Sequence, residues 1–363
     1  MKVRFLNLSV TDPDERKAFH QALDNILDHG LLVIGPEVER FEESISRYTS
    51  SPYAIGVGSG SDAIFLALKA LGINVGDEVI TSCMSFVATA NAISLTGAKP
   101  VFADLGEDLN IDPDSIRSLI TPKTKAIIPV HYGGLMADMA EIQKIADEFK
   151  LQVVEDASQA FGATAGGRYA GTLGDIGAIS LNPMKILAGM GEAGIVLTAN
   201  ETLRLKLETL RYNGLEDRKL CRWPSTNARL DTLQAAFLQY RLEQVNDLIQ
   251  KRREIASYYR QSFGHLVSCP KDIEERKHVY YTFNILTEHR DALLAHLTQN
   301  DIESKVYHPI ISHEPAYKQA ECRTTNANKL FAKKLAIPCH EKLSDNEVQF
   351  VVDTILQFFE NHE

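Results

Sequence analysis

The sequence predicts an α/β fold, a mostly parallel sheet with helices on both faces, followed by a smaller α+β domain. Two observations predict it. Between residues 52 and 156, short apolar runs rich in Val and Ile alternate with segments whose apolar residues recur at helical spacing. After residue 200, longer helical patterns replace this alternation. Buried parallel strands are typically short continuous apolar runs, whereas helices show the 3.6-residue period.

The elements follow one another in the order that a parallel sheet requires. We expect strands at 52–59, 77–82, 99–104, 125–131 and 151–156, and helices at 61–73, 85–97, 112–120 and 138–150. Two further apolar runs, 176–181 and 193–199, are interpreted as strands of the same sheet. In an open sheet of this kind, ligands bind outside the carboxyl ends of the strands.

A second domain follows the sheet. A helical pattern without Pro or Gly covers residues 229–263, and we interpret it as a spine that joins two domains. Beyond it, the segments 278–287, 303–310 and the amphipathic 344–362 indicate a smaller α+β domain. We therefore place a large domain at residues 1–245 and a small C-terminal domain at 246–363.

Composition excludes several classes of protein. The chain has 363 residues, 44% of them hydrophobic and 24% charged, which is typical of a folded soluble protein. No signal peptide and no membrane helix are expected. The net charge of −10 argues against nonspecific nucleic-acid binding, and no nucleic-acid partner is expected. The five cysteines form no C-x-x-C pair, so we expect neither a disulfide framework nor a metal site, and the cytoplasm is the simplest location.

A glycine-rich turn, "VGSGSDA", follows the first predicted strand. The chain passes through Gly58 and Gly60, and we expect a helix to begin at Ser61 or Asp62. The unpaired N–H groups at a helix start attract anions, most naturally a phosphate. The alternative is an ordinary capped helix after a glycine turn.

Asp156 ends a buried apolar strand, where a side chain projects into the ligand crevice. An ionised carboxylate there needs a cation or hydrogen-bond donors, and a metal or a protonated heterocyclic nitrogen could supply the charge. The alternative is a helix cap, because Gln159 stands where the glutamine of a capping box would be. The residues by themselves leave both open.

Lys185 lies among apolar residues and before three glycines, in "ISLNPMKILAGMGEAG". A loop lysine ordinarily points into solvent, but its apolar neighbours do not suit an exposed loop. A partly desolvated lysine has a lowered pKa and can act as nucleophile and base. A fourth stretch, "STNARLDTLQAA", contains Asn227 and Arg229, for which helix capping and surface roles are the default.

A phosphate cradle, a carboxylate able to hold a pyridinium and a Schiff-base lysine, in this order, are the parts of a pyridoxal-phosphate (PLP) enzyme. The chain resembles the sugar aminotransferases of the DegT/DnrJ/EryC1/StrS family, which have the aspartate-aminotransferase-like fold (fold type I). The resemblance covers nearly the whole length and includes "GSGSDAIFLALKALGINVGDEVITSCMSFVATANAI", "VVEDASQAFGA" and "NARLDTLQAA".

The resemblance implies a role for each residue of the site. Lys185 carries PLP as a Schiff base, Asp156 pairs with the protonated pyridine nitrogen, Gln159 lies near the ring hydroxyl and Phe86 stacks on the ring. Ser61, the backbone at Asp62 and Ser180 hold the phosphate, and Asn227 reaches it from the neighbouring subunit. A homodimer with a shared active site is therefore implied.

The resemblance also implies the reaction. An amino group passes from a donor, glutamate in most of the family, to a keto-sugar attached to a nucleoside diphosphate. Departures from the family pattern occur at Ile186, after the lysine, and at Ser312 and Glu314, in a region that tends to face the substrate, so the sugar's identity is left open. The alternatives are a PLP-dependent sugar dehydratase, which Lys185 disfavours because such relatives carry histidine there, a cyclitol aminotransferase, and a non-catalytic regulator.

Overall fold

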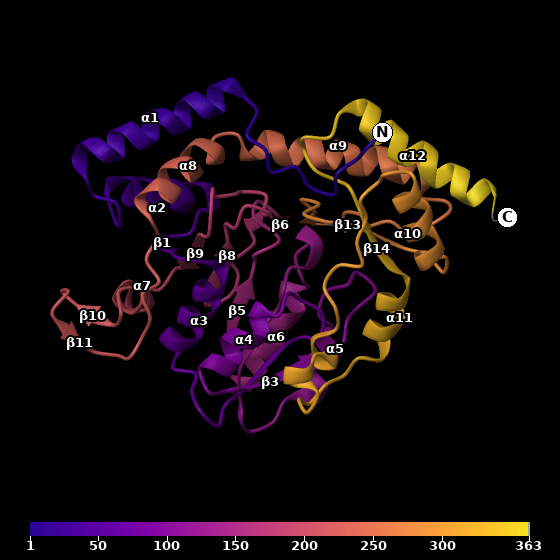
Figure 1. The fold of residues 1–363 in the computed structure, drawn as a ribbon. Helices are drawn as coiled ribbons and strands as arrows, with labels where there is room; N and C mark the ends of the chain where they lie inside the picture. The colour runs from indigo at the N-terminus through magenta and orange to yellow at the C-terminus, as the bar shows by residue number, and fades with distance from the viewer. Residues whose placement is uncertain (274, 362–363) are drawn as a thin grey trace.

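The structure is a computed structural model that describes residues 1–273 and 275–361. Within these residues, seven strands form the main sheet in the order β1-β9-β8-β5-β4-β2-β3 (Figure 1). Along the chain they are β1 (Tyr53–Val57), β2 (Glu78–Ser82), β3 (Lys99–Ala103), β4 (Thr124–Ile128), β5 (Gln152–Asp156), β8 (Ile176–Ser180) and β9 (Gly194–Thr198). The strands predicted at these places are confirmed, including the two that flank Lys185.

The sheet is mostly parallel. Strands β3, β2, β4, β5 and β8 pair in parallel with their neighbours. Strand β9 is antiparallel to both β8 and β1, so β1 runs in the same direction as β8. Among the seven described strands only β9 is reversed, and the carboxyl ends of the others lie at one edge of the sheet.

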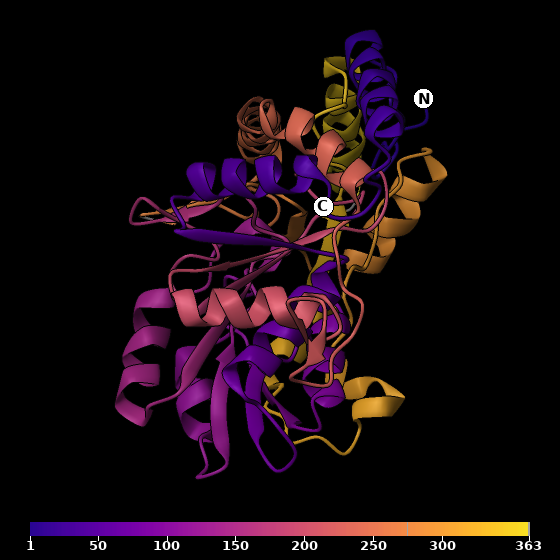
Figure 2. The ribbon, with the colours of Figure 1, turned by 90° about the vertical axis from the view of Figure 1, so that its left-hand side faces the viewer.

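Helices cover both faces of the sheet (Figure 2). Consecutive residues of a strand point to opposite faces, so Ile127 joins one apolar core and Ile128 the other. The first face is covered by α2 (Pro36–Thr49), α5 (Pro113–Leu119), α6 (Met139–Phe149) and α8 (Thr232–Leu242). The second face is covered by α3 (Gly60–Leu71), α4 (Ala88–Leu95) and α7 (Glu201–Arg211).

A separate apolar core lies in the C-terminal part of the chain. The antiparallel pair β13 (Phe283–Leu286) and β14 (Lys334–Ile337) packs there with α9 (Val245–Phe263), α10 (Arg290–Gln299) and α12 (Asp345–Glu360). Ser344 and Glu347 cap α12 reciprocally, and Figure 1 shows α12 beside α9. Val3, from the start of the chain, also packs into this core. The domain boundary at residue 245 stays a prediction.

The remaining elements connect these parts. They are α1 (Pro13–His29), α11 (Thr325–Lys333), the 3-10 turns η1 (Tyr132–Gly134), η2 (Ile311–His313) and η3 (Pro315–Tyr317), and the short strands β6 (Thr164–Ala165), β7 (Arg168–Tyr169), β10 (Leu215–Glu216), β11 (Leu220–Cys221) and β12 (Arg276–Lys277). In the described part of the chain, no helix combines the length and apolar character needed to cross a membrane.

Three predictions differ from the structure. The single helix expected over 229–263 is two helices, α8 and α9, separated at Glu243 and Gln244. Most of α9 packs on the second core whereas α8 packs on the first, so tertiary packing overrides the continuous helical pattern. The segment 303–310, which indicated a part of the small domain, forms single bridges at Lys305 and Ile310 and no helix or strand. The helix expected over 344–362 ends at Glu360, and residue 362 lies outside the described residues.

Candidate active site

The candidate site lies at the carboxyl edge of the sheet. Strand β5 ends at Asp156, β8 ends at Ser180, and β1 leads into the turn at Gly58. Because β1, β5 and β8 run in the same direction, these three ends meet at one edge, where ligands of open α/β sheets bind.

The N-terminus of α3 forms the first wall of the site. The helix begins at Gly60, one residue earlier than predicted, with Ser59 as its cap. Ser59 Oγ accepts the N–H of Asp62 at 3.0 Å and donates to the Asp62 carboxylate at 2.8 Å. The Asp62 N–H is therefore engaged with Ser59 here, and the phosphate contact expected of it stays a prediction. The earlier N–H groups of the first turn have no partner within the helix and remain suited to an anion.

Ser180 lies against this helix start. A methyl group added at Gly60 would overlap the Cα and Cβ atoms of Ser180, so only glycine permits this close approach of α3 and β8. Ser180 is mostly buried, and its Oγ accepts the N–H of Asn182 at 3.4 Å. The structure thus brings Ser180 to the helix terminus that also carries Ser61.

Asp156 is buried, with 3% of its surface exposed. Its Oδ2 accepts the hydroxyl of Thr89 at 2.7 Å, and its Oδ1 accepts the N–H of Ser158 at 3.1 Å. The residues after it form turns, so the interpretation of Asp156 as a helix cap is wrong. The aspartate side chain bonds the backbone two residues ahead instead, which stabilises a turn.

Thr89 was not identified from the sequence. It stands three residues after Phe86, in the first turn of α4. Residues three apart on a helix share a face, so the predicted helix over 85–97 already placed Thr89 beside Phe86. Only the packing of α4 against β5 shows that this hydroxyl meets the carboxylate of Asp156.

Lys185 follows β8 in a loop that other elements hold in place. Within the loop, the N–H of Gly189 donates to the Leu181 carbonyl at 2.7 Å. From α8, Arg241 donates to the Ala188 carbonyl, and the Gln234 side-chain oxygen accepts the N–H of Met190. These contacts fix both sides of the loop around the lysine.

The amino group of Lys185 lies 4.7 Å from the ring centroid of Tyr281. Burial lowers the pKa of Lys185 below its ordinary value, and attraction to Asp156 opposes that effect. The Tyr281 hydroxyl lies 3.3 Å from that of Tyr307. Neither tyrosine stands in a motif that the sequence analysis identified, and both are far from Lys185 along the chain. The arrangement provides an amine that is readily neutral, beside an acid.

Phe86 and Gln159 lie at the same edge. The ring of Phe86 is 59% exposed, which is unusual for so large an apolar side chain, and its centroid lies 6.4 Å from that of His308. The oxygen of the buried Gln159 amide accepts the N–H of Gly133 at 2.9 Å. The nitrogen of that amide therefore faces the other way, where it can donate to a ligand.

Asn227 stands apart from these residues. It is exposed, and its oxygen accepts a hydrogen bond from Arg229 at 2.7 Å, while Arg229 lies over the Tyr212 ring. The neighbouring Ala228 carbonyl accepts the N–H of Gly58, so this segment runs along the glycine turn. The contact expected of Asn227 across a subunit boundary stays a prediction.

The residues at this edge suit a flat phosphorylated heterocycle that carries an aldehyde. The first turn of α3 presents unpaired N–H groups beside Ser180. Asp156 accepts hydrogen bonds from the neutral donors Thr89 and Ser158 and can accept a ring N–H, and the exposed Phe86 ring offers a stacking face. An amine with a lowered pKa can bond to the aldehyde. No group of three or more metal-ligating side chains exists among residues 1–273 and 275–361.

Comparison with known proteins gives consistent matches. A model of the DegT/DnrJ/EryC1/StrS aminotransferase family matches residues 13–356. The chain is 36% identical to a pleiotropic regulatory protein of Geobacillus stearothermophilus over 99% of both chains. It is 34% identical to the dTDP-3-amino-3,4,6-trideoxy-alpha-D-glucose transaminase of Streptomyces venezuelae over 99% of this chain and 97% of that one. The crystal structure of S. venezuelae DesV in complex with a ketimine intermediate matches with a TM-score of 0.94, 34% identity and 98% coverage of both chains.

Proposed function

The chain belongs to the DegT/DnrJ/EryC1/StrS aminotransferase family, and from this premise we propose that it is a PLP-dependent transaminase that aminates a nucleotide-linked keto-sugar. The amino donor in this proposal is L-glutamate. The relative in S. venezuelae is named for a dTDP-sugar, which supports a nucleoside diphosphate as the carrier of the substrate. The reaction would serve amino-sugar biosynthesis.

One observation carries the proposal. The amine of Lys185, whose pKa is lowered by burial, lies close enough to Asp156 for the carboxylate to act on it, at an edge that also presents a helix N-terminus. A lysine in that setting is uncharged often enough to react with an aldehyde, while the carboxylate remains available for a ring nitrogen.

Each residue then has a defined task. Bound PLP would supply an electron-withdrawing ring that stabilises negative charge at the substrate carbon. Asp156 accepts the ring N–H and keeps that nitrogen protonated, and the Thr89 hydroxyl holds the carboxylate in place. Lys185 takes a proton from the substrate carbon and returns it. Phe86 covers one ring face, Gln159 donates to the ring hydroxyl, and Ser61 with Ser180 holds the phosphate.

The first experiment locates the cofactor. The purified protein, supplied with PLP, is reduced with borohydride and digested, and the adduct is mapped by mass spectrometry. We expect it on Lys185 alone. Lys334→Met is the matched control, because Lys334 is completely buried and its replacement should leave the adduct unchanged. An adduct at another position, or none, would refute the proposal. Glutamate should convert the bound cofactor to its amine form, and keto-sugar nucleotides should restore the aldehyde spectrum.

A shared active site requires a second copy of the chain. We propose that Asn227 reaches the phosphate of the other subunit, which its exposure permits. Lys185→Ala and Asn227→Asp each disable the site differently. If Asn227 acts across the boundary, refolding the two inactive variants together yields dimers in which one site is intact, and activity returns. If Asn227 acts within its own subunit, the mixture stays inactive.

A regulatory role is the second candidate, because a relative at 36% identity is named a pleiotropic regulatory protein. The two roles can be distinguished by testing a variant in a cell that depends on this protein. Lys185→Ala should abolish an enzymatic role and leave a non-catalytic one intact.

A further inference from the structure

A completely buried polar pair, Glu155 and His131, lies next to the candidate site. Glu155 and His131 both have 0% exposed surface, and Glu155 Oε2 lies 2.8 Å from His131 Nε2. Glu155 is the neighbour of Asp156 on β5, so its side chain points to the opposite face of the strand. The reaction as proposed assigns no task to either residue.

The Glu155 carboxylate is fully hydrogen-bonded. Besides His131, it accepts the N–H groups of Gly171 at 2.9 Å, Leu173 at 2.6 Å and Gly174 at 2.7 Å. Every one of these groups donates to the carboxylate, and donors stabilise its ionised form. The residue is therefore an anion inside the protein.

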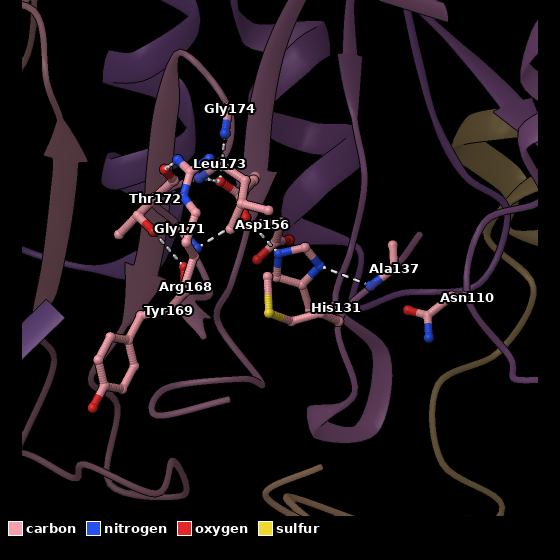
Figure 3. A network of polar contacts seen from close by, with 12 residues as sticks. Asn110, His131, Ala137, Asp156, Arg168, Tyr169, Gly171, Thr172, Leu173 and Gly174 are labelled. Atoms are coloured by element: carbon pink, nitrogen blue, oxygen red, sulfur yellow. Dashed lines mark hydrogen bonds and ion pairs between the residues drawn. The ribbon is translucent and has the colours of Figure 1, made fainter. Parts of the chain in front are cut away.

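The partner of this anion is a neutral imidazole. The backbone N–H of Ala137 donates to His131 Nδ1 at 3.2 Å, so that nitrogen is an acceptor and the ring proton is assigned to Nε2 (Figure 3). His131 then donates to Glu155. The pair keeps one net negative charge, directly adjacent in sequence to Asp156.

The same histidine is bonded to the backbone of the candidate site. The backbone N–H of His131 donates to the Asp156 carbonyl at 3.1 Å, and the backbone N–H of Asp156 donates to the Pro129 carbonyl at 2.9 Å. Two residues further on, Gly133 donates its N–H to the Gln159 amide oxygen. The segment 129–134 therefore holds both Asp156 and Gln159, and the His131 ring anchors that segment to Glu155.

We infer that Glu155 and His131 are positioning residues of the proposed cofactor site. They fix Asp156 and Gln159 through the segment 129–134, and they place a permanent negative charge behind the carboxylate that meets the ring nitrogen. The charge favours a protonated ring, and the fixed Gln159 presents its amide nitrogen as a donor. The inference rests on the proposed function.

The test uses three variants of the full chain. Glu155→Gln removes the charge and retains the shape. His131→Gln keeps an amide donor toward Glu155 but replaces the rigid ring, whose Nδ1 accepts the N–H of Ala137, with a flexible side chain. Asp175→Asn is the matched control, because the Asp175 carboxylate also accepts a backbone N–H of β5, that of Val153 at 2.8 Å, at the far end of the strand from Asp156.

Three quantities are measured for each variant: thermal unfolding of the apo-protein, affinity for PLP by fluorescence quenching, and the pH midpoint of the bound-cofactor absorption. Removal of a nearby negative charge makes protons on the cofactor easier to lose, so Glu155→Gln should lower the midpoint by about one pH unit and weaken PLP binding roughly tenfold. His131→Gln should weaken binding severalfold with a smaller shift of the midpoint. Asp175→Asn should lower thermal stability alone.

The outcomes separate this inference from the proposed function. If the wild type fails to bind PLP, both are refuted. If the wild type binds PLP but the variants behave as Asp175→Asn does, with lower stability and an unchanged midpoint and affinity, the pair is only a structural support. If Glu155→Gln does not fold, the PLP affinity and pH midpoint of His131→Gln decide the question, because this variant retains a donor toward Glu155.

Discussion

Two lysines in this molecule, the partly exposed Lys185 and the completely buried Lys334, have opposite surroundings. Lys185 lies in a loop at the carboxyl edge of the sheet, beside the Tyr281 ring and under the influence of Asp156. Lys334, the first residue of β14, is completely buried and forms no ion pair in the described part of the chain. Its amino group donates to the Tyr132 hydroxyl at 2.7 Å and to the His308 carbonyl at 3.3 Å.

The difference shows that burial alone does not define an active lysine. Burial lowers the pKa of both, that of Lys334 to about 7. Lys185 is partly exposed, so a substrate can approach it, and Asp156 lies near enough to attract its charge. Lys334 joins segments from both halves of the chain, and its surroundings leave no room for a reactant.

The largest expected effect is a difference in activity between variants of the two lysines. Lys185→Ala should reduce transamination by at least about 10³-fold, because under the proposed function the amine would supply both the covalent link and the proton transfer. Lys334→Met should retain turnover at the wild-type level. Steady-state kinetics with glutamate and a keto-sugar nucleotide provide the measurement. Equal losses in the two variants would contradict the distinction between them.

The acid near Lys185 is the feature that Lys334 lacks. Asp156→Asn should reduce turnover roughly 100-fold, because under the proposed function a neutral amide would no longer keep the ring nitrogen protonated. Thr89→Val, which removes one hydrogen bond to that carboxylate, should cost far less, about a fewfold. If Asp156→Asn were as active as the wild type, the carboxylate would have no role in the chemistry.

Lys334 should affect how the free energy of unfolding depends on pH. Its pKa is about 7 in the folded protein and near its ordinary value of 10.5 when unfolded, so the unfolded chain binds more protons between these pH values. Stability therefore rises with pH across that range, by about 2 kcal/mol between pH 7 and pH 9. Urea unfolding of the wild type and Lys334→Met should show this rise in the wild type relative to the variant. Parallel curves would refute it.

The smallest effect concerns the ring beside Lys185. Tyr281→Leu removes an aromatic face that attracts a cation, so the ammonium form of Lys185 loses stabilisation and its pKa should fall further, by less than one unit. The pH dependence of turnover should move to lower pH by that amount. A shift to higher pH would show that the ring acts mainly by excluding water.

The sequence predicted correctly those elements whose pattern lies within a single segment of the chain. The alternation of apolar runs and helical periods located every strand of the main sheet, because period and burial are local properties. Lys185 and Asp156 were predicted from their places after apolar runs, which become strands β8 and β5, and their roles stay predictions. The break between α8 and α9 has no local signal, since neither Pro nor Gly occurs there, and it arises from packing on two cores.

The contacts around the site could not be predicted in the same way. Thr89, Tyr281 and His131 reach it from separate elements, and only the folded chain shows which atoms meet. The apolar neighbourhood that singled out Lys185 also surrounds Lys334 in "FAKKLAIP", so that criterion was incomplete. Lys185 also follows a predicted strand and precedes glycines. This position along the chain, and not the apolar neighbours, distinguished it from Lys334.

The reversal of β9 has a consequence for insertions and deletions. Because β8 and β9 are hydrogen-bonded neighbours, the segment bearing Lys185 leaves and re-enters the sheet about one strand spacing apart, roughly 4.8 Å. An added residue there has no crossover helix to absorb it and would carry the amine away from β5. We therefore expect length changes to be tolerated in the outer turns, such as the one between β10 and β11, and to be damaging in this return.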